Sequence, residues 1–169
     1  MKRLILEKLE KWKQSKRRKP LLLRGARQVG KTWVLKEFGN TFADGFVHID
    51  FDKQVEYRQF FEQTKDVKRI LDNLALATGK KITPKTLIIF DEIQACESAL
   101  NSLKYFYEDA PQYSVVGAGS LLGLKLASGF PVGKVEFLDM YPMTFTEFLF
   151  ANGDANLVEY LDSIEKVEN

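Results

Sequence analysis

The amino-acid sequence predicts an α/β fold, a three-layer α/β/α sandwich whose middle layer is a parallel sheet of five strands. Short apolar runs typical of buried strands alternate along the chain with segments whose apolar residues recur at helical spacing. A glycine-rich turn follows the first of these runs directly, and two adjacent carboxylates follow the third. Because strands that alternate with helices pair in parallel, we expect helices on both faces of the sheet.

The composition is that of one globular domain in a reducing compartment. The chain has 169 residues, of which 45% are hydrophobic and 28% are charged, as is ordinary for a soluble protein. No apolar run approaches the roughly 18 residues that span a bilayer, and no signal peptide is recognisable. A single cysteine, Cys96, excludes an internal disulfide. We therefore expect a cytoplasmic protein with no membrane partner.

Positive charge is concentrated in the first part of the chain. The net charge is only +2, yet residues 1–31 contain twelve Lys and Arg against Glu7 and Glu10. Such a basic arm suits nucleic acid or a membrane surface. A solvated helix and linker is the simpler interpretation, because no aromatic interleaving or groove-reading motif accompanies the charge. Nucleic-acid binding through residues 2–19 stays open beside it.

A helix, a linker and a strand are predicted before the glycine-rich turn. Helical spacing of apolar residues predicts an amphipathic helix over residues 1–14, and a charged linker follows it. Residues 21–23 are three consecutive leucines, which is typical of a buried parallel strand. Residues 25–30 must then form a turn, and a helix over residues 31–38 should end at the next glycine.

Four further strands and four further helices are expected beyond this turn. Apolar, aromatic and β-branched residues predict strands over residues 46–51, 86–90, 113–116 and 135–138. Helical spacing of apolar residues predicts helices between Val67 and Gly79, over residues 98–109 and over residues 156–166. Thr144 and Glu147 have the spacing of a capping box, which should begin one more helix.

Residues 25–32 match the phosphate-binding pattern G-x-x-x-x-G-K-[ST]. The glycines let the backbone curl so that successive N–H groups converge on phosphate oxygens, and the positive end of the following helix points to the same place. Lys31 should reach the β- and γ-phosphates, and the Thr32 hydroxyl should bind Mg²⁺. The expected nucleotide-binding residues are Gly25, Ala26, Arg27, Gln28, Val29, Gly30, Lys31 and Thr32.

Two adjacent carboxylates, Asp91 and Glu92, follow the third predicted strand. Parallel sheets bind ligands at the carboxyl ends of their strands, so Asp91 should hold Mg²⁺ through water, across from Thr32. Glu92 should orient or deprotonate the water that attacks the γ-phosphate. The extra strand over residues 46–51 indicates a glutamate-using ATPase. GTP is not expected, because Gln94 stands where a GTPase has glycine; Gln94 is a candidate for positioning water.

Ser120 follows the fourth predicted strand and is a candidate sensor of the γ-phosphate or of the attacking water. It could also cap a following helix, and the two roles are compatible. Lys31, Glu92 and Ser120 are thus the expected catalytic residues. His48, a lone histidine within a strand, is expected to pack or to face solvent rather than to act in catalysis.

Four segments occur in a specific order: Gly-Ala-Arg-Gln-Val-Gly-Lys-Thr, Ile-Ile-Phe-Asp-Glu-Ile-Gln, Gly-Ala-Gly-Ser-Leu-Leu and Phe-Leu-Asp-Met-Tyr-Pro-Met-Thr-Phe-Thr-Glu-Phe-Leu. With them, residues 18–150 resemble the AAA-domain ATPases of bacteria and archaea that carry a second, poorly characterised C-terminal domain. The resemblance implies an ATPase core with strand order 5-1-4-3-2 and a C-terminal half that this chain lacks. That family usually has Gly-Arg before the fifth strand, where this chain has Gly133 and Lys134; lysine keeps the charge but not the forked contact.

Pattern and resemblance together predict a basic helix and linker over residues 1–19, a P-loop ATPase domain over residues 20–150 and the start of a further helical segment over residues 151–169. The domain should bind ATP and Mg²⁺, hydrolyse ATP slowly by itself and couple the nucleotide state to a partner domain or subunit. One alternative is a nucleic-acid-binding regulator for which ATP is only a ligand. Another is a small-molecule kinase, against which Ser120 and the adjacent Asp-Glu pair argue.

Overall fold

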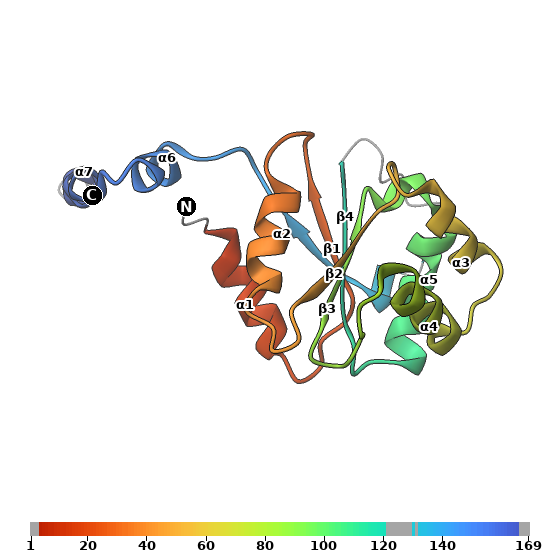
Figure 1. The fold of residues 1–169 in the computed structure, drawn as a ribbon. Coiled ribbons are helices and arrows are strands. Elements are labelled where there is room, and N and C mark those ends of the chain that lie inside the picture. Colours follow the sequence, from red (N-terminus) through yellow and green to blue (C-terminus); the bar gives the residue numbers. More distant parts are fainter. Residues whose placement is uncertain (1–3, 121–129, 131, 166–169) are drawn as a thin grey trace.

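The computed structural model describes residues 4–120, 130 and 132–165 (Figure 1). Its centre is one sheet of five parallel strands in the spatial order β2-β3-β4-β1-β5. The α/β class and the order 5-1-4-3-2 are both confirmed, since this is the same order counted from the other edge. The strands are β1 (Leu21–Gly25), β2 (Phe46–Asp50), β3 (Leu87–Asp91), β4 (Ser114–Ser120) and β5 (Glu136–Asp139).

Helices cover both faces of the sheet and complete the three layers (Figure 1). Each face has its own buried apolar cluster, because successive side chains of a strand point to opposite faces. Leu21 and Leu23 therefore pack with one set of helices, whereas Leu22 packs with the other. The first set is α1 (Ile5–Gln14) and α2 (Lys31–Gly39), and the second is α3 (Gln59–Glu62), α4 (Val67–Thr78) and α5 (Glu97–Asp109).

Strand β4 is longer than the sequence predicts, because it continues beyond residue 116 to Ser120. The sequence predicts that the strand ends at residue 116 and that Gly117 follows it. In the structure, a Cβ at Gly117 would lie 2.8 Å from Leu22 Cδ2 and 2.9 Å from Ile93 Cδ1. Close packing against these two side chains therefore requires the glycine, and the strand does not end there.

Several short helical segments were not predicted, because they are too short to show a helical period. They are α3 and the 3₁₀ helices η1 (Val55–Arg58), η2 (Ile93–Ala95) and η3 (Val132–Lys134). The longer helices agree with their predicted ranges to within a few residues at each end where the structure describes them.

Two helices follow the sheet, α6 (Phe145–Ala151) and α7 (Ala155–Glu165), and they lie on the side of α1, away from the strands (Figure 1). The predicted capping box is present: Thr144 Oγ1 accepts from the Glu147 amide at 3.2 Å, and Glu147 Oε2 accepts from the Thr144 amide at 3.0 Å. Glu147 Oε1 also accepts from the Leu4 amide at 2.9 Å, which joins α6 to the start of α1.

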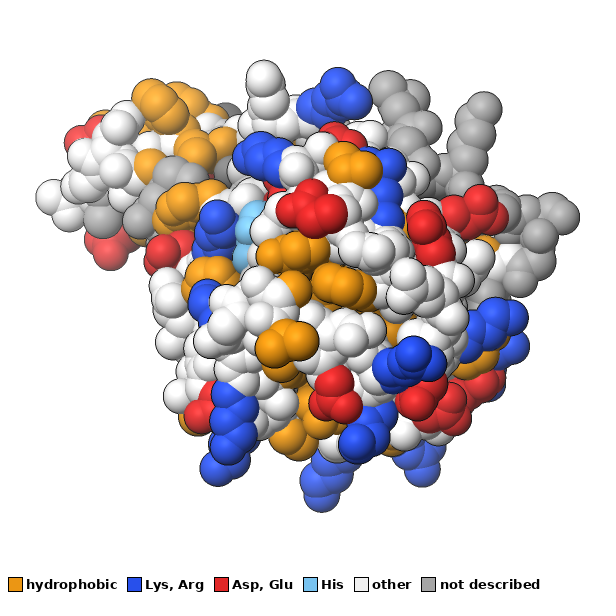
Figure 2. All heavy atoms as spheres, turned by 45° about the vertical axis from the view of Figure 1, so that its right-hand side comes forward, with side chains coloured by type: hydrophobic (Ala, Val, Ile, Leu, Met, Phe, Trp, Pro, Cys, Tyr) orange, Lys and Arg blue, Asp and Glu red, His pale blue; other side chains and the backbone are white. Residues whose placement is uncertain are grey.

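Large apolar side chains are exposed around α6 and α7, and Figure 2 shows apolar side chains gathered at the upper left, where these helices lie. Those that are at least half exposed, by 50% to 68%, are Tyr141, Phe145, Phe148, Leu157 and Tyr160. Within the described part of the chain, no helix is both long and apolar enough to cross a membrane. An apolar surface of this kind is typical of a region that another protein surface covers.

Candidate functional site

The carboxyl ends of the strands bring the predicted functional residues to one edge of the sheet. Gly25 ends β1, Asp91 ends β3 and Ser120 ends β4. Gly25 and Ser120 are opposite each other across the β1–β4 pair, and Asp50 of β2 is opposite Asp91. The loop at residues 26–30 leaves β1 at this edge and leads directly into α2 (Figure 1). The predicted phosphate-binding, metal-binding and catalytic groups are therefore neighbours.

The loop has the backbone that a phosphate-binding turn needs. Gly30 has φ of 92° and Gln28 has φ of 63°, both in the left-handed region. A Cβ at Gly25 would lie 2.5 Å from the carbonyl oxygen of Met140, so only glycine fits where β1 passes the chain beyond β5. Helix α2 begins at Lys31, and the first N–H groups of a helix have no intrahelical partner and favour an anion.

The side chain of Lys31 lies inside the loop and is only 6% exposed. Its Nζ donates to the carbonyl oxygens of Gly25 at 3.0 Å and of Ala26 at 2.8 Å. Burial lowers the pKa of Lys31, while the negative charges of Glu92 and Asp91 raise it. The ammonium is thus held by two neutral acceptors, which phosphate oxygens could replace with stronger charge-assisted hydrogen bonds.

Asp91 is the buried centre of a small polar network and is 2% exposed. Its Oδ2 accepts from Thr32 Oγ1 at 2.6 Å and lies 3.0 Å from His48 Nε2. Burial alone would raise the pKa of Asp91, but the hydrogen bonds to His48 and Thr32 act against burial and the pKa is lowered. The structure therefore joins Thr32 and Asp91 as the sequence suggests, and it adds His48, which the sequence did not place here.

Glu92 follows Asp91 with φ of 48°, a left-handed backbone that is uncommon outside glycine and marks local strain. Its amide donates to Asp91 Oδ1 at 3.1 Å, and its Oε2 accepts from Gln94 Nε2. The carboxylate is half-buried and is close enough to act on the pKa of Lys31. Gln94 thus holds Glu92 directly, a contact that the sequence did not suggest; that Gln94 positions water stays a prediction.

Ser120 is 6% exposed at the end of β4, and the helix it was expected to cap falls on residues 121–129, outside the described residues. Arg27 is exposed within the loop. Lys134, in contrast, lies in η3 before β5, at the edge where the strands begin, with its Nζ 3.5 Å from Glu108 Oε1. Lys134 therefore does not join the phosphate loop of its own chain.

The oxygen donors at this edge suit a Mg²⁺ ion that arrives with phosphates. In residues 4–120, 130 and 132–165, no group of three or more His, Cys, Asp and Glu could hold a metal ion by itself. Thr32 Oγ1 and Asp91 Oδ2 are adjacent oxygens at the end of the loop. Mg²⁺ typically takes one or two carboxylates and completes its shell with phosphate oxygens and water, so these residues fit it.

An open parallel sheet with this glycine loop and an Asp-Glu pair at its carboxyl edge defines a P-loop nucleotide-binding domain. The model of the AAA domain family matches residues 17–149, and the chain belongs to this family. It is therefore an ATP-binding domain of the AAA type.

Solved structures with a similar fold include the two that follow. DnaA from Aquifex aeolicus, bound to AMPPCP, is 13% identical with a TM-score of 0.52, over 93% of this chain and 53% of that chain. The Aeropyrum pernix ORC1 protein, in complex with DNA, is 15% identical with a TM-score of 0.54, over 90% of this chain and 47% of that chain. At these identities the likeness shows the fold alone, and this chain spans about half the length of either protein. No curated protein sequence matches the chain significantly.

Proposed function

We propose that this AAA domain binds Mg²⁺–ATP at the carboxyl edge of the sheet and hydrolyses it slowly. The observation that carries the proposal is the convergence of Lys31, Thr32 and Asp91 at the end of the phosphate loop, with Thr32 Oγ1 only 2.6 Å from Asp91 Oδ2. Phosphates in the loop would receive N–H groups from its backbone and from the start of α2.

Binding rearranges the contacts that these groups make without a nucleotide. Lys31 leaves the carbonyls of Gly25 and Ala26 for oxygens of the β- and γ-phosphates. Thr32 and Asp91 would hold Mg²⁺, Asp91 through water, and the bound ion would supply positive charge to the phosphates. His48 keeps Asp91 oriented through its contact with Oδ2.

Glu92 is the proposed general base. A water oxygen attacks the γ-phosphorus, the bond from that phosphorus to the β–γ bridging oxygen breaks, and the Glu92 carboxylate accepts the proton of the water. Gln94 holds the carboxylate on the side of Lys31, where the γ-phosphate would lie. Ser120, at the end of the adjacent strand β4, is the proposed contact to the γ-phosphate.

Coupling to a partner would run through the helices on the α1 face. The phosphate loop continues into α2, α2 packs against α1, and the Glu147–Leu4 hydrogen bond joins α1 to α6. We assign residues 20–150 to the ATPase domain, residues 1–19 to a basic helix and linker, and residues 151–169 to a further helical segment. The exposed apolar side chains around α6 and α7 support a partner domain or subunit on this side.

The test replaces Glu92 by Gln, which keeps the shape of the side chain and removes its charge. We expect hydrolysis to fall by roughly 10²–10⁴, the usual contribution of a positioned general base, while Mg²⁺–ATP binds as tightly as before or more tightly. Single-turnover phosphate release and equilibrium binding of labelled ATP measure the two effects. Glu97→Gln, at an exposed position of α5, is the matched control. Hydrolysis at the parent rate in Glu92→Gln would exclude Glu92 as the base.

A further inference from the structure

A cavity of about 410 Å³ lies at the edge where the strands begin, opposite the phosphate loop. It is formed between the linker that joins α1 to β1 and the segment that joins α5 to β4. Figure 2 shows Lys and Arg side chains, with some Asp and Glu among them, along the lower edge of the molecule, the edge at which the strands begin in Figure 1. We call this cavity the basic groove; its lining includes Lys16, Arg17, Arg18, Tyr107, Pro111 and Gln112.

Among the described residues, the cations that line the basic groove have no paired counter-charge. Lys16, Arg17 and Arg18 are consecutive, and no described carboxylate pairs with any of them. Two nearby acids make other contacts, since Glu108 pairs with Lys134 at 3.5 Å and Glu136 accepts from the Lys19 amide at 3.4 Å. Uncompensated charges that line a concave surface raise the local concentration of anions.

Arg18 is the groove cation that water solvates least, because it is half-buried. Its Nη1 donates to the Lys13 carbonyl at 3.0 Å, and its guanidinium carbon lies 5.4 Å from the centre of the Trp12 ring. Its Nε is buried without a hydrogen-bond partner among the described residues. Burial lowers the pKa of Arg18, so the protein holds a charged group where hydration is reduced. An anion in the groove would compensate this charge.

Tyr107 gives the groove an aromatic wall near two further cations, of which Lys134 pairs with Glu108. The Nζ atoms of Lys19 and Lys134 lie 5.9 Å and 5.2 Å from the centre of its ring, which is partly exposed. An aromatic ring among positive charges is the arrangement with which proteins stack on an unpaired base while they contact the neighbouring phosphates. A base inside a duplex is already stacked and paired, so a duplex would not use the ring.

We propose that the basic groove binds single-stranded nucleic acid, DNA or RNA, with Tyr107 stacking on a base and Lys16, Arg17 and Arg18 contacting phosphates. The five residues of β1 separate this edge from the phosphate loop by about 17 Å, so a nucleotide in the loop does not occupy the groove. A nucleotide in the loop therefore does not compete with a ligand in the groove.

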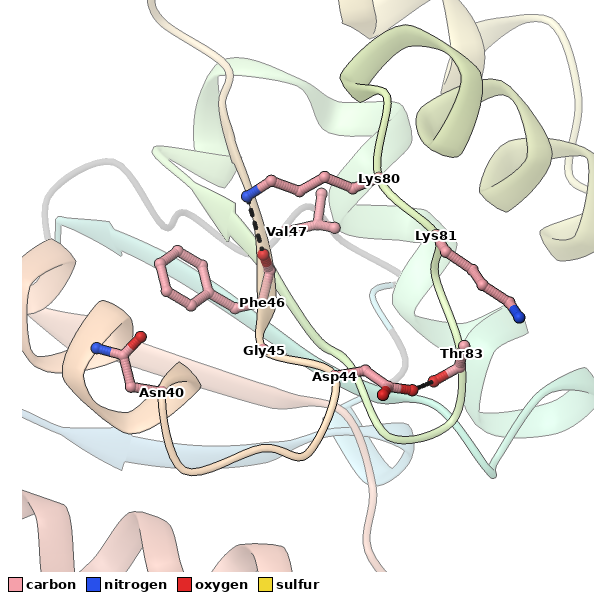
Figure 3. Close-up of a pocket in the computed structure, with 8 residues that line it drawn as sticks. All are labelled: Asn40, Asp44, Gly45, Phe46, Val47, Lys80, Lys81 and Thr83. Atoms are coloured by element: carbon pink, nitrogen blue, oxygen red, sulfur yellow. Dashed lines mark hydrogen bonds between the residues drawn. The ribbon is translucent and has the colours of Figure 1, made fainter.

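Another cavity at the same edge, of about 540 Å³ beside the start of β2, lacks these properties (Figure 3). Lys80 Nζ donates to the Phe46 carbonyl at 3.3 Å, and the carboxylate of Asp44 accepts from the Thr83 hydroxyl. Its lining includes the negative charge of Asp44, which disfavours a polyanion. Lys80 and Lys81 line this cavity and are exposed, so they provide a matched control.

The first experiment measures fluorescence anisotropy of labelled 20-nucleotide oligo(dT) and oligo(U) with the 169-residue chain. The double substitution Lys16→Glu and Arg17→Glu should raise the Kd at least 10-fold and reduce the slope of log K against log salt by about 1.4, because two phosphate contacts are lost. Lys80→Glu with Lys81→Glu changes the net charge equally and should change the Kd less than twofold. All four positions are exposed, so both variants should keep the melting temperature of the parent.

The second experiment tests stacking and the alternative ligands. Tyr107→Leu should weaken binding to the oligonucleotides about 5-fold or more, whereas Tyr107→Phe, which keeps the ring, should bind like the parent. Duplex DNA and phosphatidylserine vesicles should bind more weakly than the single strands, with no dependence on Tyr107. Equal losses in the two double variants, no effect of Tyr107→Leu, tighter binding of the duplex, or binding of vesicles alone would each overturn the proposal.

Discussion

The two edges of the sheet are built in opposite ways. At the carboxyl edge Lys31 and Asp91 are buried and are satisfied within the protein, since Lys31 donates to two loop carbonyls and Thr32 donates to Asp91. Gln94 Oε1, in contrast, is buried with no hydrogen-bond partner among the described residues. At the edge where the strands begin, Lys16 and Arg17 of the basic groove are exposed, and no described carboxylate pairs with them. The charged groups at the carboxyl edge thus have partners within the protein, whereas Lys16 and Arg17 of the basic groove face solvent.

This difference predicts how each edge responds to change. A ligand at the carboxyl edge replaces internal hydrogen bonds, so removing one group there leaves its partners buried and unpaired, at a cost of about 1–3 kcal/mol or more for each. Contacts at the other edge are exposed to water and are screened by salt, and each phosphate contact contributes separately to the affinity. We therefore expect large effects of single substitutions at the first edge and small effects at the second.

The largest expected effect is on the rate of ATP hydrolysis and comes from the lack of an arginine at the transition state. Near the carboxyl edge, Arg24 is paired with Asp139 at 2.8 Å and 3.1 Å, Arg58 donates to a backbone carbonyl and Arg27 is exposed. An arginine at the transition state contributes about 10³–10⁵ in rate to phosphoryl transfer. Without one in place, the isolated chain should release phosphate from saturating Mg²⁺–ATP at well below one turnover per second. Several turnovers per second by a monomer would show that one of these arginines acts in its own site.

Lys31→Ala should give the next largest effect. Removing the buried cation that faces the phosphates should weaken Mg²⁺–ATP binding by about two orders of magnitude or more. At a nucleotide concentration 100 times the Kd, the parent gains about 2.7 kcal/mol of stability, and the variant should lose most of the corresponding rise in melting temperature. Lys36→Ala, at an exposed position of the same helix, is the control. An undiminished rise in Lys31→Ala would place the nucleotide elsewhere.

Much of the carboxyl edge was predictable from the sequence, because its groups are contiguous or follow strands directly. The loop pattern needs only the order of residues 25–32. The contact between Thr32 and Asp91 follows from the rule that parallel strands end at the same edge, once the strands are recognised. Burial of all three leucines at residues 21–23 follows from the two covered faces of the sheet.

Contacts that depend on register and on distant packing were not predictable in this way. His48 was expected to pack or to face solvent, but the β2–β3 register places it opposite Ile89, and side chains two residues apart share a face, which brings it to Asp91. Tyr107 joins residues 15–19 only because α5 ends where β1 begins. The sequence shows no aromatic interleaving in the basic arm; the fold brings an aromatic ring to it.

His48→Ala should give an intermediate effect, through Asp91. Losing an outer partner of a metal ligand typically lowers metal affinity 10- to 100-fold. We expect the Mg²⁺ concentration that half-saturates ATP binding to rise by that factor, while ATP binding without Mg²⁺ stays as in the parent. Titration of Mg²⁺ at fixed labelled ATP measures this. His48→Gln, whose amide can donate to Asp91, should restore part of the affinity, and an unchanged Mg²⁺ requirement in His48→Ala would exclude a positioning role.

The same variant should unfold more readily in acid. The folded-state pKa of Asp91 lies below its ordinary value of 3.8, so the interactions that lower it stabilise the fold above that value and are lost as the pH falls through the folded-state pKa. Without His48 the folded-state pKa of Asp91 should rise, and acid unfolding should begin at a higher pH. Circular dichroism during acid titration in metal-free buffer gives the midpoint, and equal midpoints would mean that His48 does not act on Asp91.

Lys16→Ala should give the smallest effect. It tests the expectation that single substitutions at the edge where the strands begin have small effects. Lys16 is exposed and is one of several cations in the groove, so its loss should weaken oligonucleotide binding only about 2- to 5-fold, as for other exposed charge pairs. The salt slope should fall by about 0.7, the contribution of one phosphate contact on a single strand, and the rise in melting temperature with Mg²⁺–ATP should not change. Anisotropy at several salt concentrations measures both quantities. If this single substitution costs more than 100-fold, the groove depends on one directed contact as the carboxyl edge does. The presence of partners for the charged groups at one edge and their absence at the other would then not explain why substitutions at the two edges differ in effect.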